Sequence, residues 1–120
     1  MTMLKKLIFL MLCSVVFIGC GDSEDESPDV AMNETLDPAS GDVAAGQALF
    51  NTGSANCMFC HGPTADGNGF SPIEAPNIRG IAPDRLLTAV RTGPGAMDAF
   101  SQSQISTEDL NDIAAWLDSL

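Results

Sequence analysis

The pattern of hydrophobic and polar positions divides this chain into three parts. Residues 7–18 form one apolar run without a charged side chain, and residues 20–41 are polar and rich in acidic side chains. Residues 42–120 carry apolar side chains mainly at helical spacing, and no stretch alternates over the length of a useful strand. The pattern therefore predicts an all-α domain that follows two segments of different character.

Three helices are predicted in residues 42–120. The first is capped by Asp42 and ends near residue 51 or 52, and the second begins near Pro83 and stops at Gly93. The third is capped by Ser106, with acidic residues in its first turn. Its apolar positions follow the i, i+3, i+4, i+7 spacing of a buried helix face: Leu110, Ile113, Ala114 and Leu117. Residues 53–82 show no periodicity, and we expect a functional loop there.

Charge and composition exclude two classes of function. The chain has 16 acidic and 5 basic side chains and a formal net charge of −11. We expect no nucleic-acid partner, because such partners need a basic face that displaces counterions. The chain also has only one histidine, which excludes sites built on two or more imidazoles.

The N-terminal segment is predicted to be a targeting signal. Lys5 and Lys6 precede an apolar run that is too short to cross a bilayer as a mature helix. The run ends in Gly19-Cys20, which resembles a bacterial lipobox, although Phe17 is not the usual aliphatic residue. That resemblance implies a signal peptide over residues 1–19 and an acylated Cys20 that anchors the protein in a bacterial membrane facing the periplasm. Gly21, in place of an aspartate, favours the outer membrane. An ordinary signal peptide is the alternative.

The domain that follows needs a cofactor to be stable. Residues 20–41 have the composition of a flexible acidic tether. The remaining domain, residues 42–120, is marginal in size, and its only cysteines are Cys57 and Cys60, which are separated by two residues, so no useful disulfide is available.

The sequence Cys57-Met58-Phe59-Cys60-His61 matches the attachment pattern of c-type haem. Two thiols on one turn of chain can form thioethers with the two vinyl groups of haem, and the next histidine can bind the iron through Nε2. A thioredoxin-like pair would follow a strand, and structural zinc needs four ligands, so both alternatives fit poorly. We therefore expect one covalently bound haem c, which also supplies the missing core.

Elimination indicates Met97 as the sixth ligand. His61 is the only histidine, and no lysine follows Lys6. Met32 lies in the predicted tether, and Met58 lies on the same side as His61. Met97 is 36 residues after His61, and its thioether suits electron transfer. An open or water-bound position is the alternative.

These residues resemble class I cytochrome c over residues 42–120. Four stretches carry the resemblance: residues 46–50 (GQALF), 57–62 (CMFCHG), 75–80 (APNIRG) and 90–100 (VRTGPGAMDAF). It implies three or four helices around one haem. Gly46 and Phe50 would lie where the first and last helices cross, with Trp116 packed there, and the Pro76 carbonyl would accept the other N–H of His61. Asp98 stands where the family often has proline after the methionine.

We expect a membrane-anchored electron carrier rather than an enzyme. The alternatives are a haem-based sensor or peroxidase-like enzyme with a displaceable sixth ligand, and a fixed electron-transfer subunit of a dehydrogenase or reductase complex. The acidic surface predicts redox partners with a basic docking surface. We expect them to contact a largely uncharged rim around the haem edge: Met58, Phe59, Gly62, Pro63, Pro94, Gly95 and Ala96.

Overall fold

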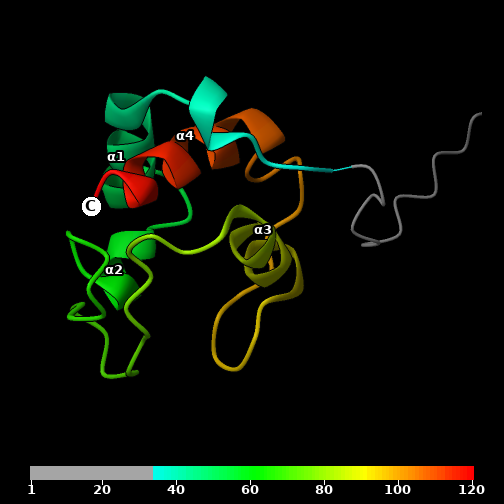
Figure 1. Cartoon of the computed structure of the whole chain (residues 1–120). Coiled ribbons are helices and arrows are strands. Elements are labelled where there is room, and N and C mark those ends of the chain that lie inside the picture. The colour runs from blue at the N-terminus through cyan, green and yellow to red at the C-terminus, as the bar shows by residue number, and fades with distance from the viewer. Residues whose placement is uncertain (1–33) are drawn as a thin grey trace, which may run out of the picture.

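The computed structural model describes residues 34–120 and is helical throughout its regular structure. The elements are a 3₁₀ helix, η1 (Pro38–Ser40), and four α-helices: α1 (Val43–Thr52), α2 (Cys57–His61), α3 (Pro83–Thr92) and α4 (Thr107–Asp118). Helices α1 and α4 pack together, and α2 and α3 lie below them, with α2 on the left and α3 on the right in Figure 1. The predicted all-α fold is confirmed. Within residues 34–120, no helix combines the length and apolar character that a membrane span requires.

The helix ends are fixed by the residues that the sequence indicated. The Asp42 side chain accepts a hydrogen bond from the Ala45 amide at 2.9 Å. Ser106 and Asp109 form a reciprocal capping box, with the Asp109 amide 3.0 Å from the Ser106 hydroxyl. Gly93 ends α3 in the left-handed conformation, with φ of 61°, which a residue without Cβ adopts without strain. The three predicted helices are thus present at the predicted positions.

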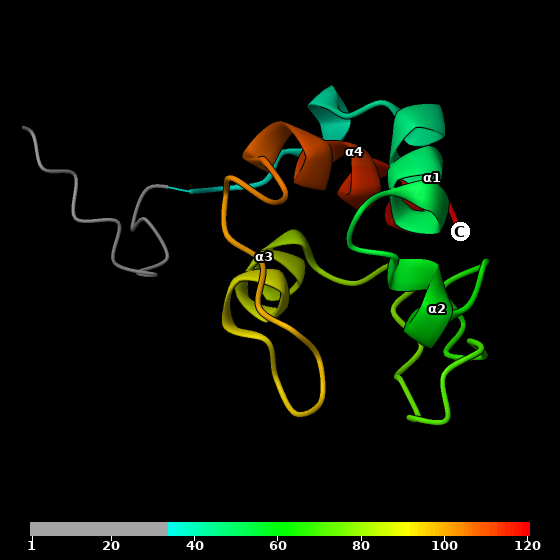
Figure 2. The same cartoon turned by 180° about the vertical axis from the view of Figure 1, so that it is seen from behind.

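The crossing of α1 and α4 depends on a glycine. A Cβ atom on Gly46 would lie only 1.9 Å from the backbone oxygen of Asp112, so only glycine permits this approach. Close to the crossing, the rings of Phe50 and Trp116 stack at a tilt of 49°, with centroids 4.8 Å apart. Both side chains are almost completely buried. Figure 2 shows the two helices in contact from the opposite side. The close approach that the resemblance implied is therefore present.

The segment over residues 53–82 is more ordered than expected. It contains α2, which periodicity could not indicate because five residues make little more than one turn. The chain after α2 folds back onto that helix: the amides of Phe70 and Ser71 both donate to the Phe59 carbonyl, at 2.7 and 2.9 Å. The Gly67 amide donates to the His61 carbonyl at 2.9 Å. The absence of a helix in this segment was therefore a wrong prediction, whereas the rest of it is loop.

The ordered structure begins earlier than predicted. Residues 34–41 were expected to belong to the flexible tether, but they lie along α4. The Asp37 amide donates to the Asn111 side chain at 2.7 Å, and Leu36 packs against the core. The Glu34 side chain is only 2% exposed and pairs with Arg91. Acidic composition suggested a tether. Contacts with residues distant in the sequence, Asn111 and Arg91, hold this segment against the domain instead. The predicted signal peptide, Cys20 and the tether up to residue 33 lie outside the described residues.

Candidate functional site

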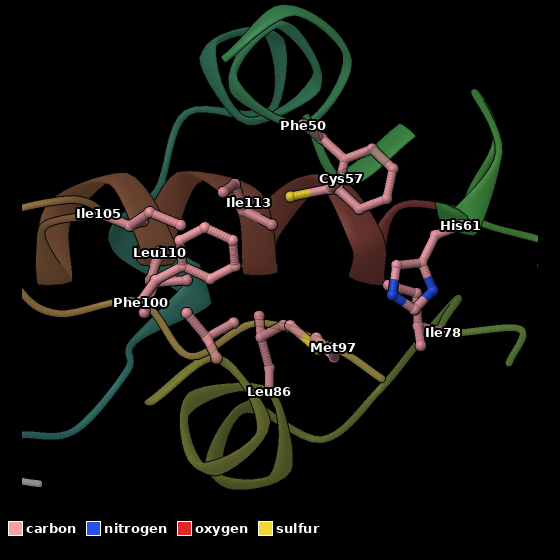
Figure 3. Close-up of a pocket in the computed structure, with 11 residues that line it drawn as sticks. Phe50, Cys57, His61, Ile78, Leu86, Met97, Phe100, Ile105, Leu110 and Ile113 are labelled. Carbon is pink, nitrogen blue, oxygen red and sulfur yellow. The ribbon is translucent and has the colours of Figure 1, made fainter. Parts of the chain in front are cut away.

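The centre of the domain holds an apolar cavity between the helices. Figure 3 shows side chains from α1, α2, α3, α4 and the connecting loops pointing toward a common space. Its lining consists of hydrocarbon and sulfur side chains with a single imidazole: Phe50, Cys57, His61, Ile78, Leu86, Val90, Met97, Phe100, Ile105, Leu110 and Ile113. Among residues 34–120, no carboxylate, ammonium or guanidinium group belongs to the lining. The lining therefore suits an apolar group better than a polar substrate.

Helix α2 supplies the reactive groups on one side of the cavity. Cys57 and His61 are four residues apart on this helix, so their side chains share a face, and both line the cavity. The sulfur of Cys57 points inward (Figure 3), and burial raises the pKa of this thiol to about 11. Cys60 is half-buried on the same short helix but does not line the cavity. Both cysteines are free thiols here and form no disulfide with each other.

The ring of His61 is oriented by the loop that follows. Its Nδ1 lies 3.1 Å from the carbonyl oxygen of Pro76. A carbonyl can only accept, so this contact requires the proton on Nδ1 and leaves the Nε2 lone pair available. The Phe50 ring lies next to the imidazole, with centroids 6.4 Å apart. The contact between His61 and Pro76 is the one that the family resemblance implied.

Met97 reaches the cavity from the loop between α3 and α4. Three backbone hydrogen bonds shape this loop: Gly93 donates to Ala89 at 2.9 Å, Met97 to Pro94 at 3.1 Å, and Phe100 to Val90 at 2.7 Å. The Met97 side chain is partly buried against the core. In Figure 3 it enters from below, whereas His61 enters from the side of α2. The fold therefore brings together three of the predicted residues, Cys57, His61 and Met97, on one cavity.

The predicted rim needs two corrections. Gly62 is buried rather than exposed, because the following loop covers it, and Met58 is half-buried against the core. Phe59 is 44% exposed, as a rim residue should be. Sequence reasoning missed two apolar side chains in the loop after α2, Phe70 and Ile73, which are 70% and 50% exposed. Their lack of periodicity left no signal that would separate exposed from buried positions.

The residues around the cavity fit haem c. A thiol pair on one turn of helix, an imidazole with Nε2 free and a thioether are the groups that bind such a cofactor, and the remaining lining is apolar. An imidazole held by a backbone carbonyl is the usual arrangement for a histidine that binds a metal. As far as residues 34–120 show, the lining also contains no buried polar side chain that a haem ring would leave without a partner.

Comparison with known proteins also indicates a c-type cytochrome domain. The family described as "Cytochrome C oxidase, cbb3-type, subunit III" matches residues 41–117. A "Cytochrome bc1 complex cytochrome c subunit" of Corynebacterium diphtheriae is 36% identical over 85 residues, which cover 70% of this chain and 28% of that protein. The protein of the same name in Mycobacterium bovis is 33% identical over 100 residues, which cover 82% of this chain and 34% of that protein. This chain spans only about a third of the length of these relatives. The matched span contains every residue that lines the cavity, the whole of α1, α2 and α3, and all of α4 except its last residue. The chain belongs to this family of c-type cytochrome domains.

Proposed function

We propose that this protein is a membrane-anchored carrier of single electrons that holds one covalent haem c. Cys57 and Cys60 would form the two thioethers, and His61 Nε2 and the Met97 sulfur would be the axial ligands. The observation that carries the proposal is the convergence of Cys57, His61 and Met97 on one apolar cavity. Bound haem supplies one-electron chemistry, and ligation by histidine and methionine favours electron transfer at a raised potential.

The chain's own residues hold the site rigid. Pro76 fixes the orientation and the tautomer of the His61 ring. Short backbone bonds on both sides of Met97 close its loop. The apolar lining excludes water from the space between them. A site held in this way changes little when an electron arrives or leaves, which suits a carrier.

The lining also weighs against the sensor or peroxidase-like alternative. Peroxide chemistry needs a positioned acid or base close to the open coordination position. In the described part of the chain, no carboxylate or imidazole other than His61 lines the cavity. Asp98, next to Met97, is exposed and outside the lining. The carrier is therefore the better-supported function.

Covalent attachment is tested by extraction of the cofactor. Acid acetone should leave the colour on the wild-type protein, and Cys57→Ala combined with Cys60→Ala should abolish coloured holoprotein. Cys20→Ala is the matched control, because it removes a cysteine outside the site and should leave the haem content unchanged. Haem that extracts freely from the wild type would overturn the proposed attachment.

The proposed anchor is tested with the same control variant. We propose that residues 1–19 are removed, that Cys20 is acylated, and that residues up to 33 tether the domain to a bacterial membrane on the periplasmic side, with the outer membrane favoured by Gly21. Cys20→Ala should then move the haem-containing protein from the membrane to the soluble fraction. The mass of the purified wild-type protein should show an acylated Cys20 as its first residue, and an unmodified Cys20 would refute the lipid anchor.

A fixed subunit of a respiratory complex is the second candidate. It is favoured by the relatives, which are named as cytochrome c subunits of a bc1 complex. The two candidates differ in how tightly the partner is held. After extraction in mild detergent, a carrier should run as a small single species, whereas a fixed subunit should co-migrate with a large complex that contains other haems.

The described charges support partners with a basic docking surface. Of the three arginines, Arg91 is only 5% exposed and is neutralised by Glu34, so only two contribute to the surface. Among the described residues, the exposed acidic side chains lie on both helices and loops: Asp37, Asp42, Glu74, Asp84, Asp98, Glu108 and Asp118. We propose that Phe59 and the exposed residues of the Met97 loop form the apolar part of the contact, inside this acidic surround.

A further inference from the structure

Glu34 occupies a buried position that the proposed electron transfer does not explain. Both of its carboxylate oxygens are used: Oε2 accepts from Arg91 Nε at 3.0 Å, and Oε1 accepts from Arg91 Nη2 and from the Thr107 hydroxyl, the latter at 2.8 Å. The side chains of Glu34 and Arg91 are 2% and 5% exposed. A bidentate, buried ion pair of this kind fixes the orientation of the Arg91 guanidinium as well as its distance from Glu34.

Arg91 transmits this constraint to the loop that carries Met97. It lies in the last turn of α3, and its Nη1 donates to the carbonyl oxygen of Phe100 at 3.1 Å. The Phe100 amide donates in turn to the Val90 carbonyl at 2.7 Å. The C-terminal end of the loop is thus held to α3 by one backbone bond and one guanidinium bond. The guanidinium bond to Phe100 depends on the orientation of the Arg91 side chain, which Glu34 fixes.

The segment that carries Glu34 is itself attached to α4. The Asp37 amide binds the Asn111 side chain at 2.7 Å, and the Asp42 amide binds the Asp112 side chain, also at 2.7 Å. Thr107, which donates to Glu34, is the first residue of α4. Glu34 therefore links three parts of the chain: the segment before α1, the start of α4 and the end of α3.

We propose that Glu34 is a positioning residue for Met97: through Arg91 it holds the loop over residues 93–100 closed against α3. This inference rests on the proposed function, because it assigns the Met97 sulfur to the iron. Loss of the Glu34 charge leaves the Arg91 guanidinium without a buried counter-ion, and the arginine then turns toward solvent. The Phe100 carbonyl loses the hydrogen bond that it accepts from Arg91, and only the bond from the Phe100 amide to Val90 still holds this end of the loop. The Met97 sulfur would then dissociate from the iron more often.

The test compares Glu34→Gln with Glu108→Gln in the full-length holoprotein. Glu108 is exposed in the first turn of α4, so its variant makes the same chemical change without touching the loop. Glu34→Gln should speed carbon monoxide binding to the reduced protein by about tenfold, a change typical of coupled neighbours. It should also weaken the red sulfur-to-iron charge-transfer band and speed hydrogen exchange of the Phe100 amide. Glu108→Gln should match the wild type in all three measurements.

A second pair of variants separates positioning from general loss of stability. Arg91→Lys keeps a positive charge but cannot hold Glu34 and the Phe100 carbonyl together, so it should also speed carbon monoxide binding. Leu36→Ala removes packing from the same segment and leaves the ion pair intact. It should lower the denaturation midpoint without changing the carbon monoxide rate. An equal rise in that rate for Leu36→Ala would overturn the proposal.

The two proposals fail in different ways. If the wild-type protein lacks the charge-transfer band and binds carbon monoxide freely, ligation by Met97 is wrong, and the proposed function fails with it. If the wild type has the band and resists carbon monoxide, but Glu34→Gln and Arg91→Lys behave like Glu108→Gln, only the positioning role of Glu34 is refuted.

Discussion

Gly46→Ala should destabilise the protein because it separates the two helices that support the cavity. The added Cβ would lie 1.9 Å from the Asp112 oxygen, 2.4 Å from the Asp112 carbonyl carbon and 2.8 Å from the Ile113 nitrogen. All three are backbone atoms, so no side chain can rotate away. Restoring a contact of at least 3.0 Å from 1.9 Å requires a displacement of about 1.1 Å between α1 and α4. That movement also disturbs the ring contact between Phe50 and Trp116.

The expected change in the free energy of unfolding follows from two opposing effects. Overpacking of a well-packed core costs roughly 1–3 kcal/mol, and the upper end applies here because helix backbone must move. Alanine in place of glycine within a helix stabilises that helix by about 1 kcal/mol. The free energy of unfolding should therefore fall by about 2 kcal/mol, which corresponds to a decrease in Tm of roughly 10 °C for a domain of this size.

The assay is unfolding of the holoprotein in guanidinium, followed by the fluorescence of Trp116, the single tryptophan. Trp116 is 3% exposed and close to the helix crossing, so its signal reports separation of the helices. Gln47→Ala is the control, because it also places alanine in α1, at an exposed neighbouring position where the change only shortens a side chain. If Gly46→Ala unfolds within about 0.5 kcal/mol of the wild type, or is more stable, the argument from close approach is refuted.

Three further predictions concern the ligand, the buried ion pair and the surface charge. Met97→Ala should lose the red sulfur-to-iron band and lower the reduction potential, as an optical redox titration would show. Arg91 lowers the pKa of Glu34 from 4.5 to about 2. This carboxylate therefore stabilises the fold fully above pH 4.5 and loses that effect as the pH falls toward 2, so urea midpoints of Glu34→Gln should depend less on pH in this range than those of the wild type. Oxidation by the native acceptor in stopped flow should slow as salt is added, because screening over about 8 Å weakens attraction to a basic partner. A rate that rises with salt would contradict that partner.

Local signals in the sequence were enough for the helices and for the haem-binding pentapeptide. The caps at Asp42 and Ser106 and the stop at Gly93 depend on residues next to the helix, so the sequence alone places them. The short α2 could not be found by periodicity. Its cysteines and histidine were recognised by their chemistry instead, since thiol and imidazole groups at this spacing have few other uses.

Contacts between distant residues could not be read from the sequence. Glu34 is 57 residues from Arg91, and nothing in an acidic segment distinguishes a carboxylate that will be buried from those that stay in water. Gly62 was placed on the rim because it adjoins the haem-binding residues, yet the loop that follows α2 covers it. The exposed Phe70 shows the converse, because hydrophobicity alone would assign it to the core.

Exposure of the reduced wild-type protein to carbon monoxide shows whether Met97 binds the iron. In the proposed site, His61 Nε2 and the Met97 sulfur would both bind the iron, which would leave no position for carbon monoxide. The spectrum of the reduced wild type should stay unchanged under carbon monoxide, whereas Met97→Ala should bind it at once. A wild type that binds carbon monoxide as readily as Met97→Ala would contradict the electron-carrier assignment and favour a sensor or an enzyme.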